Sequence, residues 1–151
     1  MSTVTLTGKD TIVIDDRILA DFADGDTCNI EFPNDLATEK AGKNGNMIYA
    51  YNAAGNIANV TLRVLRGSGD DKYLQSRLQE YINDPAAFVM VEGEFIKRLG
   101  DGAGNVVADT LTLPGGAFKK KPGAKENVAG DTEQAVSVYA LVFANSQRAI
   151  G

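Results

Sequence analysis

Apolar and polar residues alternate along the stretch Ala-Asn-Val-Thr-Leu-Arg-Val, residues 58–64. Because side chains on a β-strand point alternately to opposite faces, this pattern predicts a strand with one buried and one exposed face. An apolar and aromatic run precedes it at 47–51, and the turn-forming residues 52–56 lie between the two runs. We therefore expect the two runs to pair as a hairpin that turns around Gly55.

Strand patterns recur on both sides of this pair. A glycine-rich turn at 101–105 separates two long runs, so these are expected to form a second hairpin. The last run, 136–143, is apolar on both faces, which predicts a strand at the centre of the fold or against another subunit. The other strand-like runs lie at 11–14, 29–32, 88–96 and 106–113.

One helix is expected after the first hairpin. Ser68, Asp70 and Asp71 suit a helix start, because their side chains can cap unpaired amides and complement the positive end of the helix dipole. Apolar residues follow at helical spacing, and Pro85 favours a helix end just before it. The predicted buried stripe consists of Leu74, Leu78, Tyr81 and Ile82.

Two long stretches, 33–46 and 114–133, show no periodicity and are predicted as loops. Loops longer than about 12–15 residues are uncommon in compact domains unless they are functional or disordered. The 151 residues fit one domain of ordinary size. We therefore expect a single domain, 1–151, in which these two loops carry much of the function.

Composition narrows the class of function. The chain has no histidine and a single cysteine, Cys28, so it lacks the commonest general base and cannot form an internal disulfide. A net charge of −5 and a pI of about 4.7 disfavour binding to nucleic-acid phosphates. No apolar run reaches the length of a membrane span, and the N-terminus lacks a secretory-signal pattern, so synthesis in the cytoplasm is expected.

Acidic motifs give two candidate sites for chemistry. Glu92 and Glu94 would project from one strand face, a spacing compatible with the paired carboxylates of a glycosidase. The chain has no tryptophan on which sugars could stack, so a solvated strand face is the favoured interpretation. The 101–105 segment is a poor calcium loop, because Ala103 offers no oxygen ligand. We predict no catalytic, metal or cofactor site, and an acid-dependent hydrolase is the enzyme alternative.

A basic cluster, Lys119, Lys120 and Lys121, stands out in this acidic chain. It could be a nucleic-acid patch, a solvated loop or a docking site for the acidic surface of an identical neighbour. Only Phe118 accompanies the lysines, so stacking on nucleic-acid bases has little support. The solvated loop and the docking site are therefore favoured over nucleic acid.

A series of sequence blocks, in the same order over almost the whole chain, resembles a known family. They include Phe32-Pro33-Asn34-Asp35-Leu36, Thr61-Leu62-Arg63-Val64 with Arg66-Gly67-Ser68, and Gly93-Glu94-Phe95-Ile96-Lys97-Arg98, together with 21–26, 42–46, 130–139, 143–145 and 148–151. These blocks resemble the tail tube proteins of contractile-tailed, myovirus-type bacteriophages. The length and the order of strands and helix agree with that family.

This resemblance implies a mainly β fold, a β-sandwich or barrel with one flanking α-helix. It implies a virion structural protein whose hexameric rings stack into the inner tail tube inside the contractile sheath. The tube would meet the sheath, tape measure, baseplate and tail terminator proteins, and DNA would pass through it. The alternatives are a non-polymerising tail component of the same fold, such as a terminator or baseplate adaptor, and the tube of a phage-derived bacteriocin.

The resemblance also suggests which residues meet other subunits. Glu92 and Glu94 would face the lumen, where an acidic wall repels DNA phosphates. Residues in the two predicted loops and near the C-terminus would form contacts within or between rings. These are Asp35, Leu36, Thr38, Glu39, Lys40, Lys43, Lys119, Lys120, Lys121 and Arg148.

Overall fold

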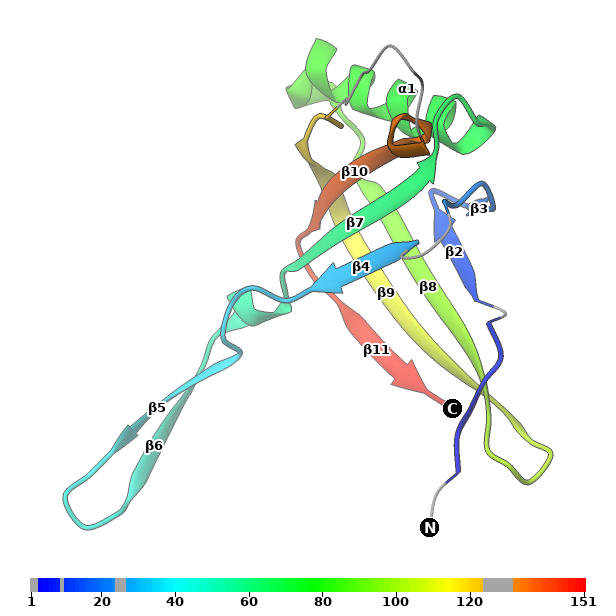
Figure 1. Cartoon of the computed structure of the whole chain (residues 1–151). Coiled ribbons are helices and arrows are strands. Elements are labelled where there is room, and N and C mark those ends of the chain that lie inside the picture. Colours follow the sequence, from blue (N-terminus) through cyan, green and yellow to red (C-terminus); the bar gives the residue numbers. More distant parts are fainter. Residues whose placement is uncertain (1–2, 9, 24–26, 124–131) are drawn as a thin grey trace.

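The computed structural model describes residues 3–8, 10–23, 27–123 and 132–151. Its longest elements are two extended strands and one helix (Figure 1). The strands are β1 (Thr5–Leu6), β2 (Thr11–Ile14), β3 (Arg17–Leu19), β4 (Cys28–Glu31), β5 (Ala37–Ala41), β6 (Met47–Tyr51), β7 (Ala58–Leu65), β8 (Val91–Gly100), β9 (Val106–Lys120), β10 (Val136–Phe143) and β11 (Gln147–Ile150). The helices are α1 (Gly69–Asn83) and the 3₁₀ turns η1 (Ala53–Asn56), η2 (Pro85–Ala87) and η3 (Thr132–Ala135).

A nine-stranded antiparallel sheet forms the body of the molecule. Its strand order is β3-β2-β8-β9-β10-β7-β4, with β1 added beside β8 and β11 beside β9. The sheet folds over along the 15-residue strand β9, whose first half pairs with β8 and β11 and whose last residues pair with β10. The predicted fold class, mainly β with one flanking helix, is confirmed.

The alternating stretch 58–64 is strand β7, and its apolar face is the centre of the core. The four apolar side chains of this face are at most 1% exposed, as the period-two pattern predicts. Strand β10 lies between β7 and β9, so the doubly apolar run 136–143 is central, as expected. The other side chains closing the core include Ile14, Leu74, Val91, Leu113, Tyr139, Leu141 and Phe143.

Helix α1 crosses one end of the sheet and begins as predicted (Figure 1). The Ser68 side chain accepts a hydrogen bond from the Asp71 amide at 3.2 Å, and Asp71 in turn accepts one from the Gly67 amide at 2.8 Å. Leu74 and Leu78 are buried, whereas Ile82 is 39% exposed and does not belong to the buried stripe. Asp70 is 2% exposed and accepts bonds from Arg17 and two backbone amides, so it also fastens the helix to β3.

The predicted hairpin around Gly55 is wrong. Strand β6 pairs with β5, and β7 pairs with β10 and β4 instead. Gly55 is buried in η1, where a Cβ would lie 2.5 Å from the Leu36 Cα atom. The turn cluster is therefore a packed corner that directs the chain out of the body, a role that local turn propensity alone cannot distinguish from a hairpin turn.

The two predicted loops also differ from expectation. The 33–46 segment contains strand β5, and the first part of the 114–133 segment continues strand β9 to Lys120. β5 has no alternation of polarity, because both of its faces are exposed. In β9, Gly116 takes a position where a Cβ would lie 2.4 Å from the Phe143 ring, so glycine marks close strand packing there. Most of the rest of 114–133 lies outside the described residues.

Candidate functional site

A two-stranded hairpin projects from the body and is the most unusual surface of the molecule (Figure 1). We call residues 37–51, which comprise β5, β6 and the turn between them, the arm. Every residue from 31 to 53 is exposed. Three neighbouring arm side chains, Ile48, Tyr49 and Tyr51, are 73%, 71% and 71% exposed. Large apolar and aromatic side chains at this exposure are typical of surfaces that another molecule covers.

The two faces of the arm carry different side chains. Directly opposite residues share a face in an antiparallel pair, and the register pairs Glu39 with Tyr49 and Lys40 with Ile48. One face, which we call the acidic face, holds Ala37, Glu39, Ala41, Met47, Tyr49 and Tyr51. The other, the basic face, holds Thr38, Lys40, Ile48 and Ala50.

Asparagine side chains fix the base of the arm. The Asn52 amide donates to the Leu36 carbonyl at 2.7 Å, and its side chain donates to the Asp35 carbonyl at 3.1 Å. Asn34 donates to the Ala54 carbonyl at 3.2 Å. Ser146, in the turn before β11, donates to the Asn56 carbonyl at 3.0 Å, which ties this corner to the body. We call the residues 34–36 and 52–56 the elbow.

Free strand edges offer a second kind of contact surface. In the half of the long β8–β9 hairpin that is nearer its turn, β1 pairs only with β8 and β11 pairs only with β9 among the described residues. β11 is further held by Arg148, whose guanidinium donates two bonds to the Asp109 carboxylate, at 2.8 and 2.6 Å. This pairing lowers the pKa of Asp109 below its ordinary value, chiefly through the hydrogen bond from Arg148. Unpaired edges accept further strands readily.

A groove of about 420 Å³ opens between β4 and the sheet formed by β2, β8 and β9. Its floor is apolar, and its rim carries the ion pairs Lys97–Asp10 and Arg148–Asp109. Cys28 borders this groove, and burial raises the pKa of its thiol to about 12. A thiol that stays protonated is a poor nucleophile, so Cys28 has the properties of a packed side chain.

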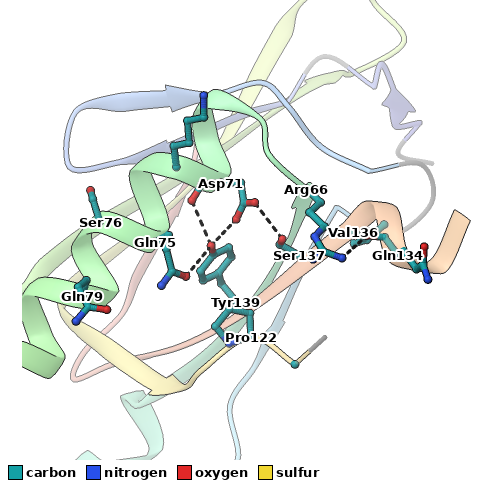
Figure 2. A pocket seen from close by; sticks show the side chains of 12 residues that line it. Arg66, Asp71, Gln75, Ser76, Gln79, Pro122, Gln134, Val136, Ser137 and Tyr139 are labelled. Atoms are coloured by element: carbon teal, nitrogen blue, oxygen red, sulfur yellow. Dashed lines mark hydrogen bonds between the residues drawn. The ribbon is translucent and has the colours of Figure 1, made fainter. Parts of the chain in front are cut away.

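A second hollow, of about 530 Å³, lies beside the start of α1 (Figure 2). There the Tyr139 hydroxyl donates to the Asp71 carboxylate, and Ser137 donates to the same carboxylate at 3.1 Å. Burial, followed by the bond to Asp71, raises the pKa of Tyr139. Each of these polar groups already serves the helix start or the strand beneath it. The arrangement joins α1 to β10.

The structure separates the residues that the sequence suggested for assembly. Thr38, Glu39 and Lys40 lie on β5, Lys43 lies in the arm turn, and Asp35 and Leu36 lie in the elbow. The basic cluster is exposed at the end of β9, and Arg148 lies on β11. The predicted residues therefore fall on three surfaces: arm with elbow, end of β9, and β11 edge. The aromatic side chains on β6 were missed, although their exposure follows once the arm is known to have no layer beneath it.

The acidic pair lies on the outward face of β8. Glu92 is exposed and Glu94 half-buried, and neither belongs to a cluster of three or more metal-ligating side chains in the described ranges. Asp15, not either glutamate, is the most connected acid nearby, since it accepts bonds from Tyr73, Arg77 and the Glu92 amide. Asp15 thus holds the β2–β3 turn between α1 and β8, and the geometry gives no support for a glycosidase pair.

The 101–105 segment is a hairpin turn. Asp101 accepts bonds from the Ala103 amide at 2.7 Å and from the Asn105 side chain at 2.8 Å. The bond from Asn105 is the main cause that lowers the pKa of Asp101. The carboxylate is engaged within the turn itself, which agrees with the preference for a turn over a calcium loop.

No helix among the described residues is long and apolar enough to cross a membrane.

No protein-family model and no curated protein matches the chain. Chains of solved structures do match, and two of these are the following. A chain in the cryo-EM structure of the anti-feeding prophage cap (AFP tube terminating cap) is 14% identical, with a TM-score of 0.61, over 97% of this chain and 91% of that chain. A chain in the cryo-EM structure of an extracellular contractile injection system, PVC sheath/tube terminator in extended state, is 15% identical, with a TM-score of 0.57, over 94% of each chain. At these identities the likeness shows a shared fold.

Proposed function

We propose that this chain is a structural subunit of a contractile tail-like particle, and that it acts at the end of the inner tube as a terminator or cap. The observation that carries the proposal is the arm. Its large aromatic and apolar side chains are exposed, and the packed elbow fixes the direction in which they can contact another subunit. The fold shared with chains from two tube-end structures supports the position at the tube end. In this role the subunit would contact the tube and the sheath.

The free edges of β1 and β11 support assembly into a closed ring. A strand edge at each side of the β8–β9 hairpin lets one subunit extend the sheet of the next. Such a contact uses two different surfaces, so it is heterologous and closes when the rotation between subunits permits. We take a single 1–151 domain as the building unit of that ring and a hexamer as its expected size.

The second candidate is the repeating subunit of the tube itself, in a phage or a bacteriocin-like particle. Two surfaces favour it: the arm, directed away from the body, and the exposed lysine cluster at the end of β9. Together they provide contacts beyond those of one ring, and stacked rings need such contacts. In this role the chain would surround the tape measure protein and then DNA, with Glu92 and Glu94 toward the lumen.

Electron microscopy of the purified chain over a range of concentration and salt tests the proposal and separates its two forms. A terminator gives closed rings of uniform diameter that bind the ends of preformed tubes and do not elongate. A tube subunit gives long tubes of uniform width. Monomers under every condition, with no binding to tube ends, would contradict both forms.

Charge reversal tests the lysine cluster as a contact surface. Replacing Lys119, Lys120 and Lys121 by Glu is expected to weaken assembly if the cluster docks on an acidic neighbour, and to weaken it less at high salt because exposed charges are screened. The matched control replaces them by Arg, which keeps the charge. If the Glu variant assembles as the wild type does, the cluster is a solvated surface and not a contact site.

A further inference from the structure

The arm exposes large apolar side chains on both of its faces, and this feature bears on how many partners one arm contacts. Ile48 and Tyr49 are neighbours in β6, so they point to opposite faces, and they are 73% and 71% exposed. A hairpin that lies flat on one partner needs an apolar residue only on the face toward that partner. Here a single partner would leave either Ile48 or Tyr49 in water.

We propose that the arm inserts between two further copies of this chain, with the acidic face against one copy and the basic face against the other. The inference rests on the proposed assembly and adds to it the number of partners that one arm contacts. Each arm would then join three subunits: the one that carries it and one on each of its two faces.

Charge supports two different contact surfaces on the same kind of chain. Glu39 lies on the acidic face and Lys40 on the basic face, so the two faces favour partners of opposite sign. One chain offers both. Its exposed lysine cluster at the end of β9 suits the acidic face, and its overall excess of acid, a net charge of −5, suits the basic face.

The physics of short hairpins also favours coverage on both sides. An isolated two-stranded ribbon is marginally stable in water, because neither face is packed. The elbow fixes where the arm leaves the body, but it contributes nothing to the strands beyond their base. Packing on one face would still leave the other hydrated, whereas insertion removes both faces from water and orders the whole ribbon.

Face-specific substitutions test the insertion. Tyr49→Ser removes one of the two aromatic rings from the acidic face, and Ile48→Ser removes the large apolar side chain from the basic face. Each is expected to raise the concentration at which half of the chain is assembled by about tenfold or more, as for a buried interface anchor. Val89→Ser is the matched control, because Val89 is also 73% exposed but lies outside the arm, and it should leave assembly unchanged.

The outcomes distinguish this inference from the proposed function. If wild-type chain assembles and only one of the two arm variants weakens assembly, or neither does, the insertion is wrong while the proposed function stands. If wild-type chain stays monomeric but binds tube ends, the insertion is wrong and the proposed function stands, whereas a chain that neither assembles nor binds tube ends contradicts both. Unfolding curves of the monomeric variants serve as the folding control and should match those of the wild type, since all three side chains are exposed.

Photo-crosslinking gives an independent count of partners. A photoreactive amino acid replaces Ile48, Tyr49 or both in a tagged chain, and a trace of that chain is co-assembled with unlabelled wild type. Each single label should give two-chain products, with the crosslinked peptides at different places on the partner. The double label should add three-chain products. Only two-chain products from the double label would overturn the insertion.

Discussion

Two hairpins of this molecule have the same local structure and opposite surroundings. β8 and β9 turn through a glycine-rich segment, and their inner face is covered by β7, β10 and α1. β5 and β6 turn through another glycine-containing segment, and nothing in the described chain covers either face. The strands are similar in backbone pairing, so pairing alone does not explain why the second hairpin exists. We propose that coverage by another subunit does.

The comparison predicts its largest effect in the covered hairpin. Leu113→Ala on β9 removes a side chain that is fully buried, and it should lower the free energy of unfolding by about 2–5 kcal/mol. Ile48→Ala on the arm should change it by no more than about 0.5 kcal/mol. Urea unfolding of dilute, monomeric protein measures both values. Similar losses for the two variants would show that the arm packs on the body.

Two glycines, one in the body and one in the elbow, allow a second comparison of stability and assembly. Gly116→Ala would place a Cβ against the Phe143 ring inside the body, and overpacking of this kind costs about 1–3 kcal/mol of stability. Gly55→Ala would push against the Asp35 and Leu36 backbone in the elbow, so it should redirect the arm. We expect assembly to fall with Gly55→Ala while the body loses less stability than with Gly116→Ala. An elbow variant that assembles normally would show that the direction of the arm is unimportant.

The smallest effect concerns β11 and its pH dependence. Because the pKa of Asp109 is lowered in the folded chain, its ion pair with Arg148 stabilises β11 above the ordinary carboxyl pKa, about 4, and that contribution is lost as the pH falls below it. Arg148→Ala should speed amide hydrogen exchange in β11 a few-fold at neutral pH, which is typical of an exposed ion pair. The variant and the wild type should converge in acid. A difference that persists in acid would assign the effect to packing and not to charge.

Some of this architecture follows directly from the sequence. The alternation at 58–64, the capping residues before α1 and the doubly apolar run at 136–143 each predict an element that the structure confirms, because in each case local pattern and tertiary burial agree. The family resemblance added the fold class. The candidate contact surfaces were located by residue type and charge, and their role in assembly stays a prediction.

The remaining features depend on contacts that a single sequence does not encode in its periodicity. Strand β5 has no alternation because it has no buried face, so it was interpreted as a loop. Gly55 belongs to a turn-forming cluster, but the structure needs a glycine there for another reason, because a Cβ would lie 2.5 Å from the Leu36 Cα atom. That contact joins residues distant in sequence, so local composition does not predict it. The long strand β9 passes through Pro114 and Gly115, which normally end strands, because the sheet bends there to meet β10.

One measurement tests the central claim, that the arm is the device by which this chain joins its neighbours. The Leu36 carbonyl and the Asn52 amide are already hydrogen-bonded at 2.7 Å, so residues 37–51 can be replaced by a two-residue Asn-Gly turn without opening the elbow. Full-length and armless chains are then compared by sedimentation velocity and electron microscopy at equal concentrations. We predict that the full-length chain forms rings or tubes and that the armless chain keeps its fold but remains monomeric. An armless chain that assembles as readily as the full-length chain would contradict the account.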